Sequence, residues 1–420
     1  MMKSPRVFRV LNSSQNRTLI SNFFYLGILQ TMRYLIPILV LPYVTRIIGL
    51  QHFGEIAIAS TFTLILQLCV NYSFEFMGAR DVARNREDKE VISKIVSCIL
   101  CARCIIYVVS FLIICVLVLT LKVYRPLFFL IIIAFSSEFF SMLVSEWFFQ
   151  GTEKMAHITI INVISRVIYV ILIFTLIKEE NDYFLYPLCN TIGYVFAAAY
   201  SMIIIFFKQG IKFIVPKIEW IVAYLRSGVS LFVNQVCLKS FNLFPNFLLG
   251  ILCGASVTGI YDAAAKVSTA GEHSVSVLNK TFFPFLSRNI SKHNVYAKIN
   301  IVFGIIVAFG LFLFAPIITR ILFAPEFAPA TSVLRILAVS VLGTSVMSAY
   351  STNYLLLLGE NKIVLKITIV IFILGCGLFA GLVHYFSYIG AAVAILLIKL
   401  LLAASFYLAS IKHNKRCAVN

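Results

Sequence analysis

The sequence predicts an all-α polytopic membrane protein, with about 12 transmembrane helices arranged as two six-helix bundles around a central cavity. Three observations lead to this prediction: the apolar composition, the distribution of basic residues, and rows of polar residues within apolar helices. Hydrophobic residues make up 61% of the 420 residues, and charged residues only 12%. A water-soluble core does not need so much apolar surface, so the chain is expected to lie in a membrane.

Apolar segments long enough to cross a bilayer follow one another along the chain. Each contains about 20 residues or more, which is enough for some 30 Å of hydrocarbon. The charged segment 77–91 is expected to form a helix on the membrane surface. The predicted spans are 19–42, 53–75, 95–120, 126–148, 157–177, 184–207, 228–252, 257–283, 299–322, 330–356, 363–384 and 387–410.

The basic residues predict the orientation of these spans. Most of the 35 Lys and Arg fall in the two termini and in the loops that would share a side with them. The loops on the other side contain only Arg46, Lys122, Arg125, Lys178 and Arg320. By the positive-inside rule, both termini are predicted to be cytoplasmic. The basic excess is therefore a signal of orientation, assisted by anionic membrane lipid, and not a nucleic-acid surface.

The segment 258–284 carries polar residues at steps of four and three, although it is apolar enough to cross a membrane. On a helix, these residues lie along one stripe. Each charge near the bilayer centre costs about 2.5–3.5 kcal/mol or more, so the stripe should face other helices or a water-filled cavity. One interpretation is an internal ion pair between Asp262 and Lys266, and the other is a hydrophilic pathway. The stripe consists of Asp262, Lys266, Thr269, His273, Ser276 and Lys280.

Two further predicted helices carry amides and cations on one face. The first, 19–42, has Gln30 and Arg33, and the seventh, 228–252, has Gln235, Lys239 and Asn242, followed by Asn246. Hydrogen bonds between helices explain some of these amides, but they do not explain the cations on the same face.

An internal repeat relates these regions. At an offset of 205 residues, Gly49 corresponds to Gly254 and Gly54 to Gly259, so each half would begin with two helices joined by a turn between two glycines. The sequence therefore predicts an N-terminal bundle over 1–210 and a C-terminal bundle over 211–420. Two such halves facing each other across a cavity are typical of secondary transporters.

The charges inside the spans favour an anionic substrate. Eight cations, among them Arg166, outnumber the four or five acids, so the cavity should be net positive. Three of the acids, Glu138, Glu146 and Asp262, are candidates for ion coupling. The sequence contains no phosphate-binding glycine loop, no metal-ligand cluster and no nucleophile triad, so neither a cofactor nor a metal is expected.

The sequence resembles the bacterial polysaccharide repeat-unit flippases of the O-antigen (Wzx) type, in the superfamily of multidrug, oligosaccharidyl-lipid and polysaccharide exporters. The resemblance covers essentially the whole chain. It lies in NFFYLGILQTMRYLIPILVLPYVTRIIGLQHFGEIAIA (22–59), SEWFFQGTEKM (145–155), TGIYDAAAKV (258–267) and LNKTFFPFLSR (278–288).

The resemblance implies a flippase that moves undecaprenyl-pyrophosphate-linked oligosaccharide from the cytoplasmic to the periplasmic leaflet of the inner membrane by alternating access. The resemblance also implies a polysaccharide polymerase and a chain-length regulator as candidate partners. The candidate substrate-binding residues are Gln30, Arg33, Arg166, Gln235, Lys239, Asn242, Lys266 and Lys280.

Two other classes remain open. A multidrug antiporter of the same architecture is one, although a positive cavity does not suit cationic drugs. A membrane enzyme of polysaccharide assembly is the other, although such enzymes carry a long outer loop and no predicted outer loop here exceeds roughly a dozen residues.

Overall fold

The computed structural model describes residues 14–419, and within them the side chains of all residues except 14–35, 37, 38, 238, 284, 288 and 414–419. The described residues contain helices and no strands. The α-helices are α1 Ser14–Asn71, α2 Phe74–Arg84, α3 Lys89–Thr120, α4 Phe128–Leu143, α5 Glu146–Gly151, α6 Met155–Leu176, α7 Leu185–Met202, α8 Ile218–Leu252, α9 Ala255–Arg288, α10 His293–Leu322, α11 Ala330–Tyr350 and α12 Asn361–Val419.

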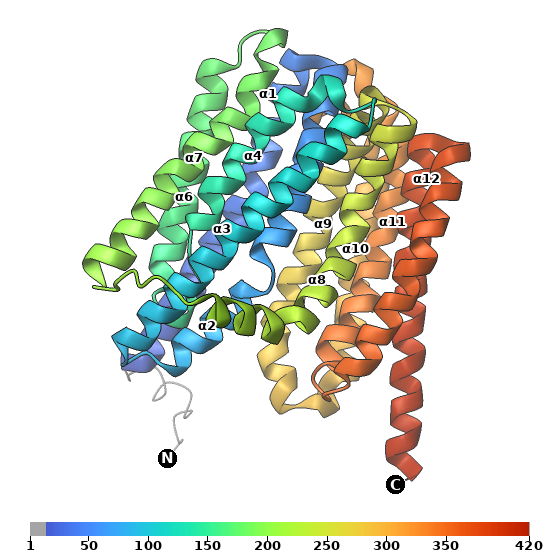
Figure 1. Cartoon of the computed structure of the whole chain (residues 1–420). Helices are drawn as coiled ribbons and strands as arrows, with labels where there is room; N and C mark the ends of the chain where they lie inside the picture. Colours follow the sequence, from blue (N-terminus) through green and yellow to red (C-terminus); the bar gives the residue numbers. More distant parts are fainter. Residues whose placement is uncertain (1–13, 420) are drawn as a thin grey trace, which may run out of the picture.

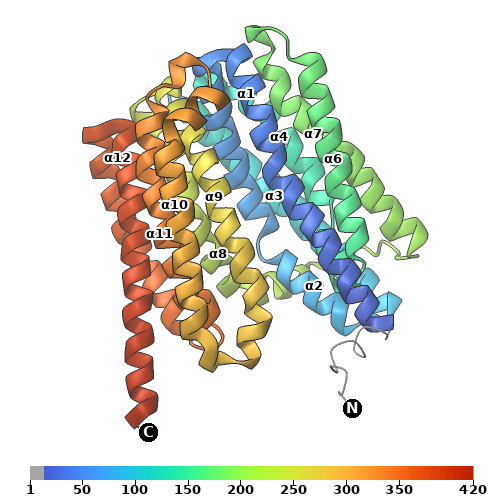
Figure 2. The ribbon, with the colours of Figure 1, turned by 180° about the vertical axis from the view of Figure 1, so that it is seen from behind.

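The helices form two groups that lie side by side (Figures 1 and 2). Helices α1–α7 pack on one another as the N half, and α8–α12 pack on one another as the C half. The described start of α1 and the end of α12 lie at the same end of the molecule. Apolar side chains such as Leu112 of α3 and Phe309 of α10 are exposed, as expected for helices that face lipid.

The predicted fold class is confirmed, whereas the number of spans is not. Among the described residues, eight helices are long and apolar enough to cross a membrane, or nine if the two parts of α8 are one span. Helix α9 is absent from this set, although it is 34 residues long, because its polar stripe lowers its hydropathy. Twelve spans therefore remain a prediction.

Two of the observed helices each contain two predicted spans. Helix α1 includes 19–42 and most of 53–75, up to Asn71, with a break at Gly49 (φ 69°, ψ 178°). Helix α12 includes both 363–384 and 387–410, with a break at Ser387 (φ 52°). A positive φ interrupts the α-helical path, so the chain changes direction at each break without a long loop.

The glycine turns of the internal repeat contact each other. Gly254 (φ 87°, ψ −178°) has nearly the same backbone conformation as Gly49, its counterpart in the repeat. A Cβ on Gly54 would lie only 1.8 Å from the carbonyl oxygen of Ala255, and a Cβ on Gly259 would lie 3.0 Å from that of Leu50. Because Leu50 and Ala255 are also counterparts, the two contacts are equivalent under the repeat. We call this contact the paired turns.

The paired turns also include a polar contact between the halves. Ser256 Oγ donates to Gln51 Oε1 at 2.5 Å, and these two residues are again counterparts at the offset of 205. Nearby, Arg46 Nη2 donates to the carbonyl of Ile321 at 2.9 Å, which ties α1 to α10. The paired turns therefore join the N half to the C half.

The chain crosses from the N half to the C half along 209–217. The backbone N–H groups of Lys212 and Ile214 donate to Ser93 Oγ (3.1 Å) and Ser97 Oγ (2.9 Å), which holds this segment against α3. The proposed domain boundary at 210 falls within this connection.

The predicted segment 77–91 is helical up to Arg84, where α2 ends, and again from Lys89, where α3 begins; its place on the membrane surface stays a prediction. In the loop between α2 and α3, Arg86 Nη2 lies 2.7 Å from Glu153 Oε1, and this guanidinium holds the pKa of the Glu153 carboxyl below its ordinary value.

Candidate functional site

A cavity of about 830 Å³ lies between the two halves. Helices α1–α7 contribute one part of its lining, which we call the N wall, and α8 and α9 contribute the other, which we call the C wall. Among the described residues, the lining contains five basic and three acidic side chains, which agrees in sign with the predicted positive cavity. They are Arg103, Arg166, Lys239, Lys266 and Lys280, and Glu75, Glu146 and Asp262.

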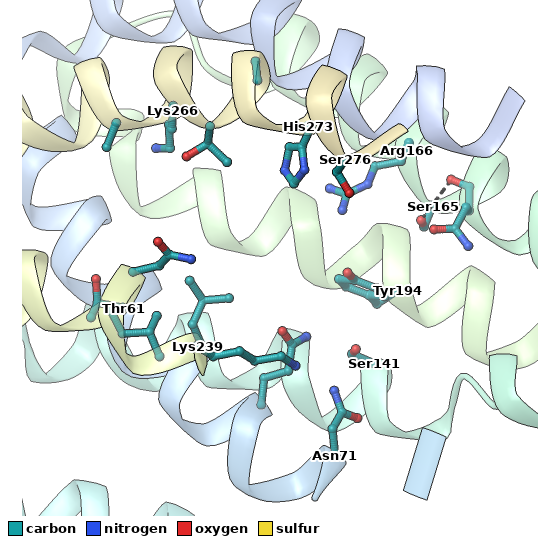
Figure 3. Close-up of a pocket in the computed structure, with 18 of the residues that line it drawn as sticks. Thr61, Asn71, Ser141, Ser165, Arg166, Tyr194, Lys239, Lys266, His273 and Ser276 are labelled. Atoms are coloured by element: carbon teal, nitrogen blue, oxygen red, sulfur yellow. Dashed lines mark hydrogen bonds between the residues drawn. The ribbon is translucent and has the colours of Figure 1, made fainter. Parts of the chain in front are cut away.

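The predicted stripe of α9 lines the cavity along its whole length. All six of its residues, from Asp262 to Lys280, are part of the lining. Figure 3 shows Lys266, His273 and Ser276 along this helix, with Arg166 of α6 reaching toward the latter two. The opposite face of α9 packs inside the C half, where Ser268 Oγ donates to the carbonyl of Leu337 at 3.2 Å. The helical period thus divides α9 into a cavity face and a packed face.

Asp262 and Lys266 form the ion pair that the sequence left open. Lys266 Nζ lies 2.6 Å from Asp262 Oδ2, and Asn246 Nδ2 of α8 donates to Asp262 Oδ1 at 2.8 Å. Lys266 Nζ also lies 4.6 Å from the ring centre of Phe53, which is close to the paired turns. The ion pair and the hydrophilic pathway therefore coexist, and the pair lies toward the end of the cavity that the paired turns close.

The predicted stripe of α8 is only partly correct. Lys239, Asn242 and Asn246 line the cavity, but Gln235 does not. Gln235 Nε2 donates instead to the carbonyl of Tyr72 at 3.2 Å. The reason is a 52° bend between Ile218–Cys237 and Lys239–Leu252, which turns the residues before the bend out of the stripe.

The N wall contains a buried arginine held by neutral groups. The Arg103 side chain is 2% exposed, and it donates from Nη1 to the carbonyl of Met142 (3.0 Å) and from Nη2 to Asn71 Oδ1 (3.3 Å). Its charge acts on the carboxylates of Glu75 and Glu146. Arg103 therefore stabilises the negative charges of these two acids without forming an ion pair with either, and both carboxylates still face the cavity.

The candidate coupling acids occupy different places. Glu138 is 1% exposed and lies behind the lining, where Gln67 Nε2 donates to its Oε2 at 3.1 Å. Glu146 lines the cavity and accepts from Asn162 Nδ2 at 2.7 Å. Glu146 therefore faces the cavity, whereas Glu138 lies outside its lining, and the ion-coupling role of both acids stays a prediction.

Besides the buried Arg103, which donates to neutral groups, three cations of the lining have no carboxylate within 4 Å among the described residues. They are Arg166 on α6, Lys239 on α8 and Lys280 on α9. Lys399, by contrast, pairs with Glu272 inside the C half. The three unpaired cations are available to an anion that enters the cavity. The described residues offer no group of His, Cys, Asp and Glu that could hold a metal ion.

The side chains of Gln30 and Arg33 lie outside those that the structure describes, so their predicted roles stay predictions. Sequence reasoning missed Asn71, Trp147 and Tyr194 among the lining residues. One signal was present: Trp147 directly follows an acid, Glu146, inside an apolar segment. The break at Val144 and Ser145 between α4 and α5 brings both residues to the cavity, and nothing in the local sequence marks that break.

The helices and the charged cavity together define a multi-pass membrane protein of the transporter type. A family model described as "Polysaccharide biosynthesis protein" matches residues 19–290, and the chain belongs to this family. The predicted family is therefore confirmed.

Two curated relatives extend this finding. The chain is 27% identical over 396 residues to a "Putative O-antigen transporter" of Shigella dysenteriae, covering 93% of this chain and 99% of the relative. It is 22% identical over 402 residues to a protein with the same description from Escherichia coli (strain K12), covering 94% and 97%.

The solved structures agree with the fold. An inward-facing MATE family multidrug-resistance transporter of the MOP superfamily superposes with a TM-score of 0.70 at 15% identity, covering 93% of this chain and 98% of the other. The lipid II flippase MurJ, in an inward closed conformation, gives a TM-score of 0.69 at 14% identity, covering 93% and 87%. These likenesses concern the fold alone.

Proposed function

We propose that the protein is a flippase for undecaprenyl-pyrophosphate-linked oligosaccharide repeat units, working in the bacterial inner membrane from the cytoplasmic to the periplasmic leaflet. The descriptions of the curated relatives as O-antigen transporters support this function. A polymerase and a chain-length regulator that use the exported unit are proposed partners. The protein is proposed to move its substrate without altering it chemically.

The observation that carries the proposal is the set of unpaired cations inside the membrane. Arg166, Lys239 and Lys280 line one cavity and have no acid partner among the described side chains. Keeping unpaired charges there is costly unless a ligand compensates them. A pyrophosphate supplies several oxygens that accept charge-assisted hydrogen bonds, and the attraction is screened less in a cavity than in water.

The composition of the cavity favours this substrate over the alternatives. Cationic drugs would be repelled by a lining with five basic and three acidic side chains. The amides of Asn242 and Asn246 and the hydroxyl groups of Thr269 and Ser276 suit a carbohydrate as well as a phosphate. The prenyl chain is proposed to remain in the lipid, outside the cavity.

Transport is proposed to proceed by alternating access around this cavity. The paired turns join the two halves at one end, and α9 leads from them along the cavity toward the end where the described chain termini lie. Separation of Gly54 from Ala255 would open the closed end while the other end closes. Glu138, Glu146 and Asp262 are the proposed candidates for ion coupling, and among the described residues Asp262 pairs with a cation, Lys266.

Binding of defined lipids to the purified protein tests this function. Undecaprenyl pyrophosphate is expected to bind, and undecaprenyl alcohol, which has the same tail and no phosphate, is expected to bind at least a hundredfold more weakly, roughly the effect of losing one or two charge-assisted bonds. Equal binding of the two lipids would contradict the proposal. A cationic drug that binds as tightly as the pyrophosphate would favour the antiporter instead.

A further inference from the structure

The N wall differs in chemistry from the C wall. The C wall carries Lys239, Lys266 and Lys280 against one acid, Asp262. On the N wall, the described lining residues include two arginines and two acids. One of these arginines, Arg166, points toward His273 and Ser276 of α9 (Figure 3). The other, Arg103, is buried and donates to protein oxygens. Among the described side chains, the part of the N wall around α5 therefore presents mainly carboxylates and amides to a substrate.

This part of the N wall is a compact cluster, which we call the α5 cluster: Asn71, Glu75, Glu146, Trp147 and Asn162. Asn162 Nδ2 donates to Glu146 Oε1 at 2.7 Å, and Asn71 Oδ1 accepts from Arg103. Helices α2 and α5 pack together, since a Cβ on Gly78 would lie 2.5 Å from the Trp147 ring. Five side chains from four helices thus converge on one part of the cavity.

One donor of the α5 cluster lacks an acceptor. Trp147 is 1% exposed, and its indole Nε1–H has no hydrogen-bond partner among the described residues, although the residue lines the cavity. Buried indole N–H groups usually have a partner. The combination of an unused indole N–H, carboxylate acceptors and amides matches a sugar, whose hydroxyl groups both donate and accept hydrogen bonds.

We propose that the α5 cluster is the sugar subsite of the cavity, and that it accepts a neutral or amine-bearing sugar and disfavours an acidic one. This inference rests on the proposed function, because it places the oligosaccharide beside a pyrophosphate that the basic side chains hold. The carboxylates of Glu75 and Glu146 accept bonds from sugar hydroxyl or ammonium groups, and they repel a sugar carboxylate. Neither this attraction nor this repulsion makes or breaks a covalent bond.

Three lipid probes test the subsite on the full-length protein: undecaprenyl pyrophosphate, the same lipid carrying an N-acetylhexosamine, and the same lipid carrying a hexuronic acid. The wild type is expected to bind the N-acetylhexosamine lipid about tenfold more tightly than the bare lipid, which is the scale of one charge-assisted hydrogen bond. The hexuronic acid lipid is expected to bind no more tightly than the bare lipid.

Two variants distinguish binding of the sugar from binding of the pyrophosphate. Glu146→Gln is expected to improve binding of the hexuronic acid lipid about tenfold, and Trp147→Phe to weaken binding of the N-acetylhexosamine lipid about fivefold, both without changing the bare lipid. Lys280→Met is the matched control, because it should weaken the binding of all three lipids by the same factor. The proposed subsite is contradicted if the Glu146→Gln variant binds the three lipids in the same order of affinity as the wild type, or if it changes all three affinities by the same factor.

A fluorescence measurement covers the case in which these variants fail to fold. The sequence has two tryptophans, and Trp220 lies on α8 away from the cavity, so Trp220→Phe leaves Trp147 as the single reporter. The N-acetylhexosamine lipid should change its emission, whereas the bare lipid should not. Identical responses to both lipids would refute the subsite while leaving the flippase intact. Failure of both pyrophosphate lipids to bind the wild type would instead refute the proposed function, and the subsite with it.

Discussion

Basic residues within the helices divide into those that a carboxylate neutralises and those that no carboxylate neutralises. Lys266 is paired with Asp262 at 2.6 Å and Lys399 is paired with Glu272, whereas Lys239 and Lys280 have no acid within 4 Å among the described residues. Spacing along α9 predicted the first pair, because residues four apart share a helix face. The second pair joins side chains 127 residues apart and could not be read from spacing.

At this scale we predict the effect of removing an unpaired cation. Lys239→Met and Lys280→Met should each weaken the binding of undecaprenyl pyrophosphate about 10- to 100-fold, because each removes one charge-assisted bond of roughly 1.5–3 kcal/mol. The Arg replacements should retain most of the affinity. Lys298→Met, an exposed cation outside the cavity, is the control and should have no effect. Wild-type affinity in both Met variants would show that these cations do not hold the substrate.

The paired cation should behave differently. Lys266→Met leaves the Asp262 carboxylate with only Asn246, and it should lower the free energy of unfolding by about 1–3 kcal/mol. The loss is smaller than for a fully buried pair because the Lys266 side chain is 36% exposed. The double variant Lys266→Met with Asp262→Asn should recover most of the stability, since no carboxylate remains unpaired. Thermal unfolding in detergent measures this, and a double variant no more stable than Lys266→Met would argue against the pair.

At the scale of elements, helix periodicity predicted α9 well and α8 less well. Helix α9 keeps one polar face from Asp262 to Lys280, so all six positions predicted from spacing line the cavity. Helix α8 bends by 52° before Lys239, so Gln235 leaves the stripe. Pro245 lies after this bend, and the sequence offers no comparable signal at the bend itself. Periodicity alone cannot locate such a change of direction, because it assumes a continuous helix.

The paired turns give a prediction for an element contact. Gly54→Ala should prevent the close approach of the two turns, because its Cβ would lie 1.8 Å from a backbone oxygen that cannot rotate away. Such overpacking costs about 1–3 kcal/mol, so the unfolding temperature should fall. Gly310→Ala is the matched control, since a Cβ there meets nothing within 4 Å. Equal unfolding temperatures for both variants would mean that the turns do not hold the halves together.

At the scale of the whole molecule, much of the architecture could be predicted from composition and the repeat. The apolar content predicted an all-helical membrane protein, and the correspondence of Gly49 with Gly254 anticipated two turns with the same backbone conformation. Sequence could not predict that these turns touch, nor that α5 brings Trp147 to the cavity, because both depend on how distant helices pack. Charge counts likewise predicted a positive cavity without identifying which cations are unpaired.

The orientation of the molecule is a further prediction at this scale. The described start of α1 and the end of α12 lie at one end of the molecule, and the basic residues predict that this end is cytoplasmic. A phosphatase fused after the C-terminus should therefore be inactive, and one inserted at Asn181 should be active. The reverse pattern would show that the molecule has the opposite orientation in the membrane, and it would contradict the proposed direction of transport.

The most direct test of the central claim is translocation by the purified protein in liposomes. A fluorescent undecaprenyl-pyrophosphate-linked oligosaccharide is placed in both leaflets, and a membrane-impermeant quencher reports the fraction that reaches the outer leaflet. With the wild type, nearly all of the fluorescence should become quenchable over time. The double variant Lys239→Met with Lys280→Met should remain close to the half that protein-free liposomes show. If the wild-type protein also leaves half of the lipid protected, or if the double variant moves it equally well, then the cationic cavity does not carry a lipid-linked oligosaccharide across the membrane.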